Sequence, residues 1–163
     1  MCTHGGELEG EQKEFDTWDK KFKDLAELIS TWSKDRSHKV AAVVVNNRNS
    51  ELSHGYNGFA RGVNDNVEKR HQRPDKYFWT EHAERNAFYH AAYEGIALRG
   101  GTIYVTLFPC ADCARGIIQC GIERVVAPRP NFDHHQYGES FKASVEMLEE
   151  VGMKIDYLEY ETK

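Results

Sequence analysis

The chain has 163 residues and a formal net charge of −5 at pH 7. This length suits one domain with an ordinary core, and the acidic balance argues against a nonspecific grip on nucleic acid, whose phosphates attract basic surfaces. There is no apolar stretch of about 18 residues and no apolar run near the start, which argues against a membrane span and a signal peptide. We therefore expect a cytoplasmic protein that binds neither membranes nor nucleic acids.

The first part of the chain divides into a polar segment and a helix. Residues 1–14 are polar and lack a hydrophobic period, which predicts a flexible tail before a single domain over residues 15–163. Apolar residues then recur at helical spacing, which predicts an amphipathic helix with a wide stripe packed on the core. These residues are Phe15, Trp18, Phe22, Leu25, Ala26, Ile29 and Trp32.

A hairpin, a long loop and a second helix follow. Residues 40–45 form an apolar, largely β-branched run that ends in the Asn-rich turn at 46–50, which predicts a β-hairpin. The segment 58–79 is charged and irregular, as is typical of long loops that carry function. A second helix is then expected to run from Thr80, as its N-cap, through Tyr93. Gly95 is expected to end it.

The last third alternates strands and helices. Residues 102–108 predict a buried strand, and Pro109 suits the first turn of a helix that Gly121 stops. A short strand is expected at 122–127, a helix at 140–150 and a final strand at 153–160. With the hairpin, this pattern predicts a five-stranded mixed sheet covered by helices on both faces, which is a three-layer α/β/α sandwich.

Four cysteines, Cys2, Cys110, Cys113 and Cys120, are too unevenly spread for a disulfide framework. Cys110 and Cys113, however, stand three residues apart at a predicted helix start, so both side chains lie on one helix face and can share one metal ion. The helix dipole favours the thiolate form that zinc binds. On this pair alone, buried apolar cysteines and a redox C-x-x-C motif remain alternatives.

His82 adds a third ligand at the start of a different predicted helix, and two helix starts at one edge of a sheet can bring all three together. Three protein ligands leave one zinc position open for water, as in catalytic sites. Glu84 is a candidate to take a proton from that water. In an ideal helix Glu84 would point about 200° around the axis from His82 unless the first turn is irregular, but from the N-terminal turn it can still reach that water. The sequence leaves this geometry open.

These residues match the H-x-E and P-C-x-x-C signature of zinc-dependent nucleobase deaminases, as "HAE" at 82–84 and "PCADC" at 109–113. Together with "GYNG" at 55–58, the ordered motifs make residues 33–127 resemble the deoxycytidylate (dCMP) deaminase family of the cytidine deaminase-like superfamily. The resemblance implies the cytidine deaminase-like fold. It also implies one catalytic Zn²⁺ held by His82, Cys110 and Cys113.

The chemistry that the resemblance implies is hydrolytic. Glu84 would pass a proton from the bound water to the ring nitrogen, hydroxide would attack C4 of cytosine, and ammonia would leave. The expected reaction converts dCMP to dUMP, which supplies thymidylate synthesis. A free base, a nucleoside, a modified deoxycytidylate or an RNA base remains an alternative substrate. A non-catalytic, zinc-stabilised interaction module is a second alternative, although Glu84 argues against it.

Substrate contacts are also implied. Asn57 in "GYNG" resembles the family asparagine that contacts the nucleoside, and Ala83 offers a backbone group beside the ring. The phosphate of a mononucleotide calls for cationic side chains. The candidates are Arg36, Lys39, Arg61 and Arg85. Family members commonly read "GYNGxPRG"; here Ala60 replaces the proline, which loosens the loop but keeps Arg61.

Three expectations concern further partners. We do not expect a second, structural zinc, because the sequence has no further close cysteine pair. The resemblance leaves open an allosteric nucleotide bound with Mg²⁺. It implies a homo-oligomer, because this family buries helices between subunits and often completes its pockets there.

Overall fold

The computed structural model describes residues 17–159, so the tail predicted at 1–14 lies outside the described residues. Its centre is a five-stranded sheet with the strand order β2-β1-β5-β6-β7. The strands are β1 (Ala41–Val45), β2 (Glu51–Tyr56), β5 (Thr102–Val105), β6 (Arg124–Ala127) and β7 (Lys154–Tyr157). Within residues 17–159, no helix combines the length and the apolar composition needed to span a membrane.

The sheet is mixed, as predicted. The hairpin of β1 and β2 is antiparallel, with Ala41 opposite Tyr56, and β1 is also antiparallel to β5. Strands β5, β6 and β7 run parallel to one another. The parallel strands need crossover helices, and those helices cover the sheet.

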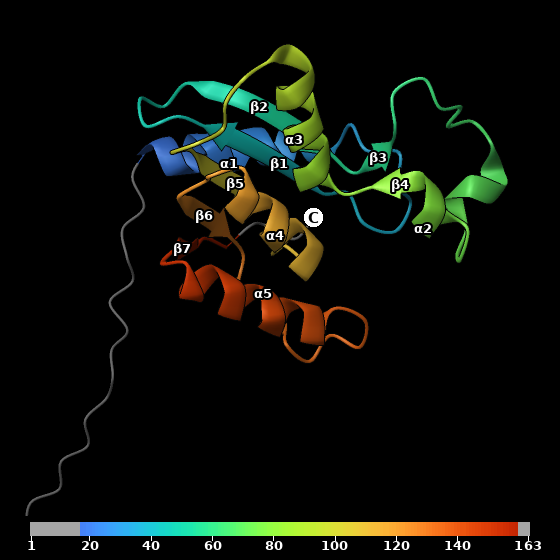
Figure 1. Cartoon of the computed structure of the whole chain (residues 1–163). Helices are drawn as coiled ribbons and strands as arrows, with labels where there is room; N and C mark the ends of the chain where they lie inside the picture. Colours follow the sequence, from blue (N-terminus) through green and yellow to red (C-terminus); the bar gives the residue numbers. More distant parts are fainter. Residues whose placement is uncertain (1–16, 160–163) are drawn as a thin grey trace, which may run out of the picture.

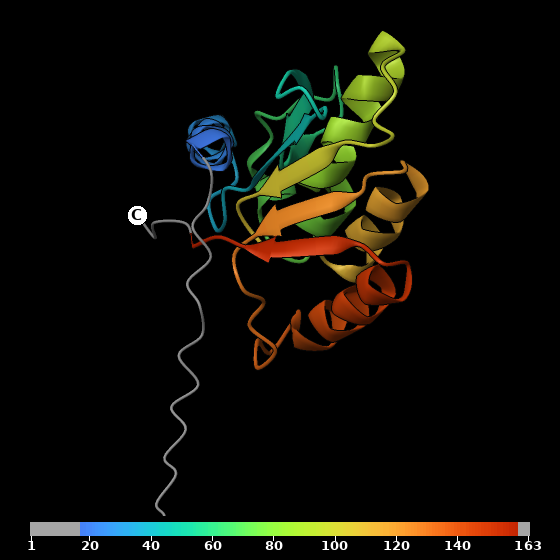
Figure 2. The same ribbon diagram turned by 90° about the vertical axis from the view of Figure 1, so that its left-hand side faces the viewer.

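Helices lie on both faces of the sheet, which confirms the three-layer α/β/α prediction (Figures 1 and 2). Helix α1 (Thr17–Ser30) covers one face, and α3 (Ala83–Glu94), α4 (Ala111–Gln119) and α5 (Gly138–Glu150) cover the other. Alternate residues of one strand therefore enter different cores. In β1, Val43 packs with α1, whereas Val44 belongs to the core beneath α3, α4 and α5.

The apolar stripe of α1 is narrower than predicted. Phe22, Ala26 and Ile29 are buried, but Trp18 is 43% exposed and Trp32, which lies beyond the helix end, is 50% exposed. The buried Asp19 occupies part of the face where a continuous apolar stripe was expected. Its carboxylate accepts hydrogen bonds from the Tyr104 hydroxyl at 2.6 Å and from Arg124 at 2.8 and 2.9 Å. The helix is thus held to the sheet partly by polar contacts.

The predicted starts of α3 and α4 were both two residues too early. Thr80 does not cap α3; it forms strand β4 (Thr80–Glu81), which pairs with β3 (Gly58–Phe59). The N-cap of α3 is His82. Likewise, Pro109 lies before the first turn of α4, because Cys110 is the N-cap. The predicted C-terminal ends of α3 and α4 are confirmed, since Gly95 and Gly121 follow these helices with left-handed φ angles of 70° and 72°.

The predicted loop at 58–79 contains short elements of its own. Besides β3, it holds the 3₁₀-helix η1 (Glu68–His71) and the short helix α2 (Lys76–Trp79). Phe59 stacks on His71 with a centroid distance of 4.9 Å, and Arg70 lies 3.9 Å over the Trp79 ring. The segment projects to one side of the sheet, next to the start of α3 (Figure 1).

Strand β2 packs closely against α3, which makes Gly55 sensitive to substitution. A Cβ atom at Gly55 would lie 2.3 Å from the Ala83 carbonyl oxygen and 2.4 Å from the Ala87 nitrogen. Both are backbone atoms, so only a shift of α3 relieves the clash. We expect Gly55→Ala to lower the free energy of unfolding by about 1–3 kcal/mol or more, measured by urea denaturation.

Gly58→Ala is the matched control, because its added Cβ meets nothing closer than the Tyr56 ring at 3.6 Å. Equal stability of the two variants would contradict the close packing of β2 on α3.

Candidate active site

The predicted metal ligands and Glu84 converge at one edge of the sheet, where β5 ends. Helix α3 leads into β5 and α4 follows it, so the N-termini of both helices lie at the carboxyl end of that strand (Figure 1). Loops beyond the carboxyl ends of parallel strands are the usual place for ligand sites in α/β sheets. The expectation that two helix starts meet at one sheet edge is therefore met.

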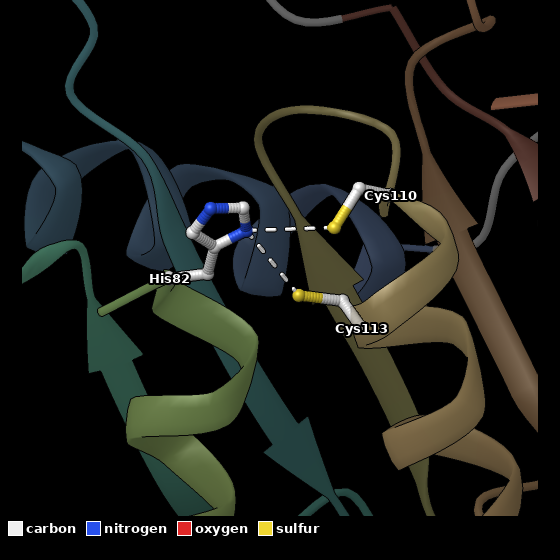
Figure 3. A group of neighbouring side chains, drawn as sticks. All are labelled: His82, Cys110 and Cys113. Carbon is white, nitrogen blue, oxygen red and sulfur yellow. Dashed lines mark hydrogen bonds between the residues drawn. The ribbon is translucent and has the colours of Figure 1, made fainter. Parts of the chain in front are cut away.

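His82, Cys110 and Cys113 point toward one another (Figure 3). The His82 Nδ1 atom lies 3.5 Å from the Sγ atom of Cys110 and 3.5 Å from that of Cys113. All three ligand atoms lie within 4.8 Å of one another. A tetrahedral ion with Zn–N of about 2.0–2.1 Å and Zn–S of about 2.3 Å separates nitrogen from sulfur by about 3.5–3.6 Å. The donor set and its spacing fit zinc.

The N-cap position of His82 explains how Glu84 can share its site. His82 has extended backbone angles, φ −74° and ψ 153°, and so stands outside the helical turn. The 100° increment per helical residue therefore does not separate the two side chains, and both line one cavity. Cys110 is also an extended N-cap residue, with φ −71° and ψ 169°. The N-cap residue and the first turn of each helix thus face the same cluster of metal ligands.

The three side chains of the cluster shift one another's pKa values in a way that suits binding of a cation. A hydrogen bond from the Cys113 thiol, assisted by one from His82, lowers the pKa of Cys110 to about 4. The same contact and burial raise the pKa of Cys113, and the hydrogen bond to Cys110 raises the pKa of His82. Cys110 is therefore already a thiolate near neutral pH, which is the form that binds zinc.

Glu84 is a buried carboxyl group beside this cluster, with only 4% of its surface exposed. Burial, and then the negative charge of Cys110, raise the pKa of Glu84 above its usual value. A carboxyl group with a raised pKa can both accept and return a proton near neutral pH. The geometry and the electrostatics of Glu84 therefore suit a proton carrier.

These residues open into a cavity of about 500 Å³, within the range of about 300–1,000 Å³ that is typical of small-molecule sites. Ala83 and Asn57 also line it. The Asn57 side chain accepts a hydrogen bond from the Val40 N–H at 2.9 Å and donates one to the His38 carbonyl at 2.8 Å. Asn57 thus holds the 38–40 segment, which forms part of the cavity wall.

Three of the four sequence-based candidates for phosphate binding do not line the cavity. Arg36 forms an exposed ion pair with Glu68, and Arg61 lies 5.0 Å over the Tyr93 ring. Lys39 is exposed, and none of these three candidates is among the residues that line the cavity. Their roles in substrate binding stay predictions. Arg85 does line the cavity, where its Nε atom donates to Glu81 at 2.5 Å.

Several lining residues were missed from the sequence. Arg73, Lys76 and Tyr77 come from the 58–79 segment, and Gln136 and Tyr137 come from the loop before α5. The length and charge of the 58–79 segment did indicate function, but no local pattern distinguishes the residues that face the cavity. The packing of α2 against distant loops makes that selection.

A histidine and two cysteines at two helix starts, with a buried glutamate beside them, define the class of zinc-dependent nucleobase deaminases on this fold. The family described as the cytidine and deoxycytidylate deaminase zinc-binding region matches residues 16–128. The chain belongs to this family, which confirms the predicted resemblance and the predicted zinc-binding character.

Individual relatives agree with this assignment. A deaminase from the luxG 3′ region of Aliivibrio fischeri is 39% identical over 142 residues, which is 86% of this chain and 93% of the relative. Human deoxycytidylate deaminase is 34% identical over 136 residues, which is 80% of this chain and 72% of the relative. The crystal structure of cyanophage S-TIM5 dCMP deaminase with dCMP and dUMP superposes with a TM-score of 0.71 at 26% identity, over 89% of this chain and 100% of that chain.

Proposed function

We propose that this protein is an enzyme that hydrolytically deaminates dCMP to dUMP and ammonia, and so supplies dUMP for thymidylate synthesis. The observation that carries the proposal is the buried Glu84 beside the His82, Cys110 and Cys113 cluster, inside a cavity large enough for a mononucleotide. The relatives named as deoxycytidylate deaminases, and the similar structure with dCMP and dUMP, support this choice of substrate.

Each protein group has a definite part in the reaction. His82, Cys110 and Cys113 would hold the zinc ion, which supplies Lewis acidity for the attack of water on C4 of cytosine. Glu84 takes a proton from that water and delivers it to the ring nitrogen next to C4. The proton of the new C4 hydroxyl group then passes to the exocyclic amino nitrogen, the bond between C4 and that nitrogen breaks, ammonia leaves and a uracil ring remains. Asn57 and the Ala83 backbone orient the nucleoside in the cavity.

Substrate identity is tested by the rate of ammonia release from dCMP, deoxycytidine, CMP and cytosine. Because a mononucleotide carries a charge near −2 that a nucleoside lacks, we expect kcat/KM for dCMP to exceed that for deoxycytidine at least tenfold, about 1.4 kcal/mol. Faster turnover of a free base or of an unphosphorylated nucleoside would replace dCMP with that substrate. No turnover of any of them, with zinc bound, would favour a non-catalytic zinc module.

We further propose that the enzyme acts in the cytoplasm as a homo-oligomer, with the 15–163 domain as its folded unit and a nucleotide as its small-molecule partner. Large exposed aromatic side chains, such as Phe78 at 85% and Tyr93 at 75%, support burial between subunits. Light scattering of the purified protein tests this, since the mass of one chain would contradict it. Repeating the assay with a nucleoside triphosphate and Mg²⁺ tests allosteric control.

A further inference from the structure

Three lysine or arginine side chains line the cavity, counted over residues 17–159, and two of them already have carboxylate partners. Lys76 Nζ lies 2.9 Å from an Asp35 oxygen, and both side chains are almost fully buried. Arg85 lies 2.5 Å from Glu81 and 3.8 Å from Asp112. The third, Arg73, forms no hydrogen bond or ion pair with any described residue. Among the described residues, Arg73 is therefore the lining cation that has no carboxylate partner and can bind an anionic ligand.

Arg73 is also exposed to the solvent from which an anionic group would enter the cavity. The zinc-ligand cluster and the buried Glu84 mark the end that takes the base, whereas Arg73 is exposed. In a nucleoside monophosphate the base and the phosphate are at opposite ends of the molecule. A base held beside the buried Glu84 therefore directs its 5′-phosphate toward the exposed part of the lining, to which Arg73 belongs.

The segment that carries Arg73 is fixed on two sides. On one side, Asp35 binds Lys76 and also accepts hydrogen bonds from the backbone N–H groups of Ser37 at 2.7 Å and His38 at 3.0 Å. Burial alone would raise the pKa of Asp35, but these hydrogen bonds outweigh it and lower that pKa, so the Asp35 carboxylate stays charged. Because Lys76 is engaged by Asp35, its role is to position the segment.

On the other side, the Gln136 side-chain amide donates a hydrogen bond to the Tyr77 hydroxyl at 3.2 Å. Gln136 belongs to the loop before α5, and both residues line the cavity. The contact links the 58–79 segment to the opposite wall. A cation held in place before the ligand arrives binds with a smaller loss of conformational entropy.

We propose that Arg73 recognises the 5′-phosphate of the substrate and so makes the enzyme selective for the nucleotide over the nucleoside. This inference rests on the proposed function. A guanidinium group can donate two parallel hydrogen bonds to phosphate oxygens, and it stays charged over the whole working pH range. Arg36, Lys39 and Arg61, which the sequence suggested for this role, do not line the cavity.

The test compares the ratio of kcat/KM for dCMP to kcat/KM for deoxycytidine between the wild type and Arg73→Ala. We expect the ratio to fall at least tenfold, because a hydrogen-bonded charge pair with the phosphate is lost. Arg73→Lys should recover part of the ratio, since lysine keeps the charge without the paired donors. Calorimetric binding of dUMP and of deoxyuridine should show the same loss of phosphate discrimination without any turnover.

Arg70→Ala is the matched control. Arg70 belongs to the same segment but stacks on Trp79 and donates to the Asn64 carbonyl at 2.8 Å, outside the cavity lining. A wild-type ratio in Arg73→Ala would overturn the proposal, as would an equal fall for dCMP and deoxycytidine. So would a loss of discrimination in Arg36→Ala or Arg61→Ala alone. If the wild type converts neither substrate, the proposed function fails, and the binding comparison still tests Arg73.

Discussion

Glu84→Gln is expected to abolish turnover while the protein keeps its bound zinc. Glutamine has nearly the same shape as glutamate, but it cannot accept a proton from water and return it to the ring nitrogen. Proton transfer by a positioned side chain contributes about 10²–10⁴-fold to enzyme rates. We therefore expect kcat to fall by at least about 10²-fold. Ammonia release measures the rate, and elemental analysis measures the metal content.

The matched control is Glu94→Gln, which changes the same residue type at the far end of α3, away from the cavity. It should keep the wild-type rate. If Glu84→Gln turned over dCMP at a similar rate to wild type, Glu84 would not be the proton carrier. Loss of zinc in that variant would instead indicate that the carboxylate helps to hold the ion.

Cys113→Ser is expected to cost the protein its metal and, with it, the activity. A serine hydroxyl is a much poorer zinc ligand than a thiolate, and the fully buried Cys113 contributes one of the three proposed ligands. Replacing a group that merely orients a ligand costs about 10–100-fold in metal affinity, so replacing a ligand should cost more. Because zinc binds the folded state, the melting temperature should fall as well.

Cys120→Ser is the control for this variant, because Cys120 is a partly buried thiol outside the ligand cluster. We expect it to keep one zinc per chain and near wild-type activity. Full zinc content and activity in Cys113→Ser would refute the proposed ligand set. A wild-type preparation that is free of metal and yet fully active would do the same.

The residues proposed for the deamination step and those proposed for substrate selectivity lie in different parts of the molecule. The ligand cluster and Glu84 lie at the starts of α3 and α4, which pack directly on the central sheet. Arg73 and Tyr77 come from the 58–79 segment, which contacts the cavity through the Lys76–Asp35 pair and the Tyr77–Gln136 hydrogen bond. Changes in this segment should therefore alter the substrate preference more than the rate of the chemical step.

Much of the fold and the ligand set could be predicted from the sequence, because the relevant signals are local. The largely β-branched run at residues 40–45, the helical spacing of Phe22, Ala26 and Ile29, and the glycine at 95 each report on backbone geometry within a few residues. The spacing of Cys110 and Cys113 at a helix start is local as well. Such patterns predicted five strands, three layers and a metal-binding cysteine pair, and the family resemblance added His82 to complete the zinc-binding cluster.

Only the tertiary structure determined which side chains face the cavity. Thr80 could not cap α3, because its backbone pairs with Phe59, and this made His82 the N-cap and brought Glu84 to the same cavity. Among residues 17–159, the lining cation without a carboxylate partner is Arg73, whereas Arg36 and Arg61 do not line the cavity. Contacts with Asp35 and Gln136 hold the segment that carries Arg73. Contacts between segments far apart in the chain set these orientations, and no short-range periodicity encodes them.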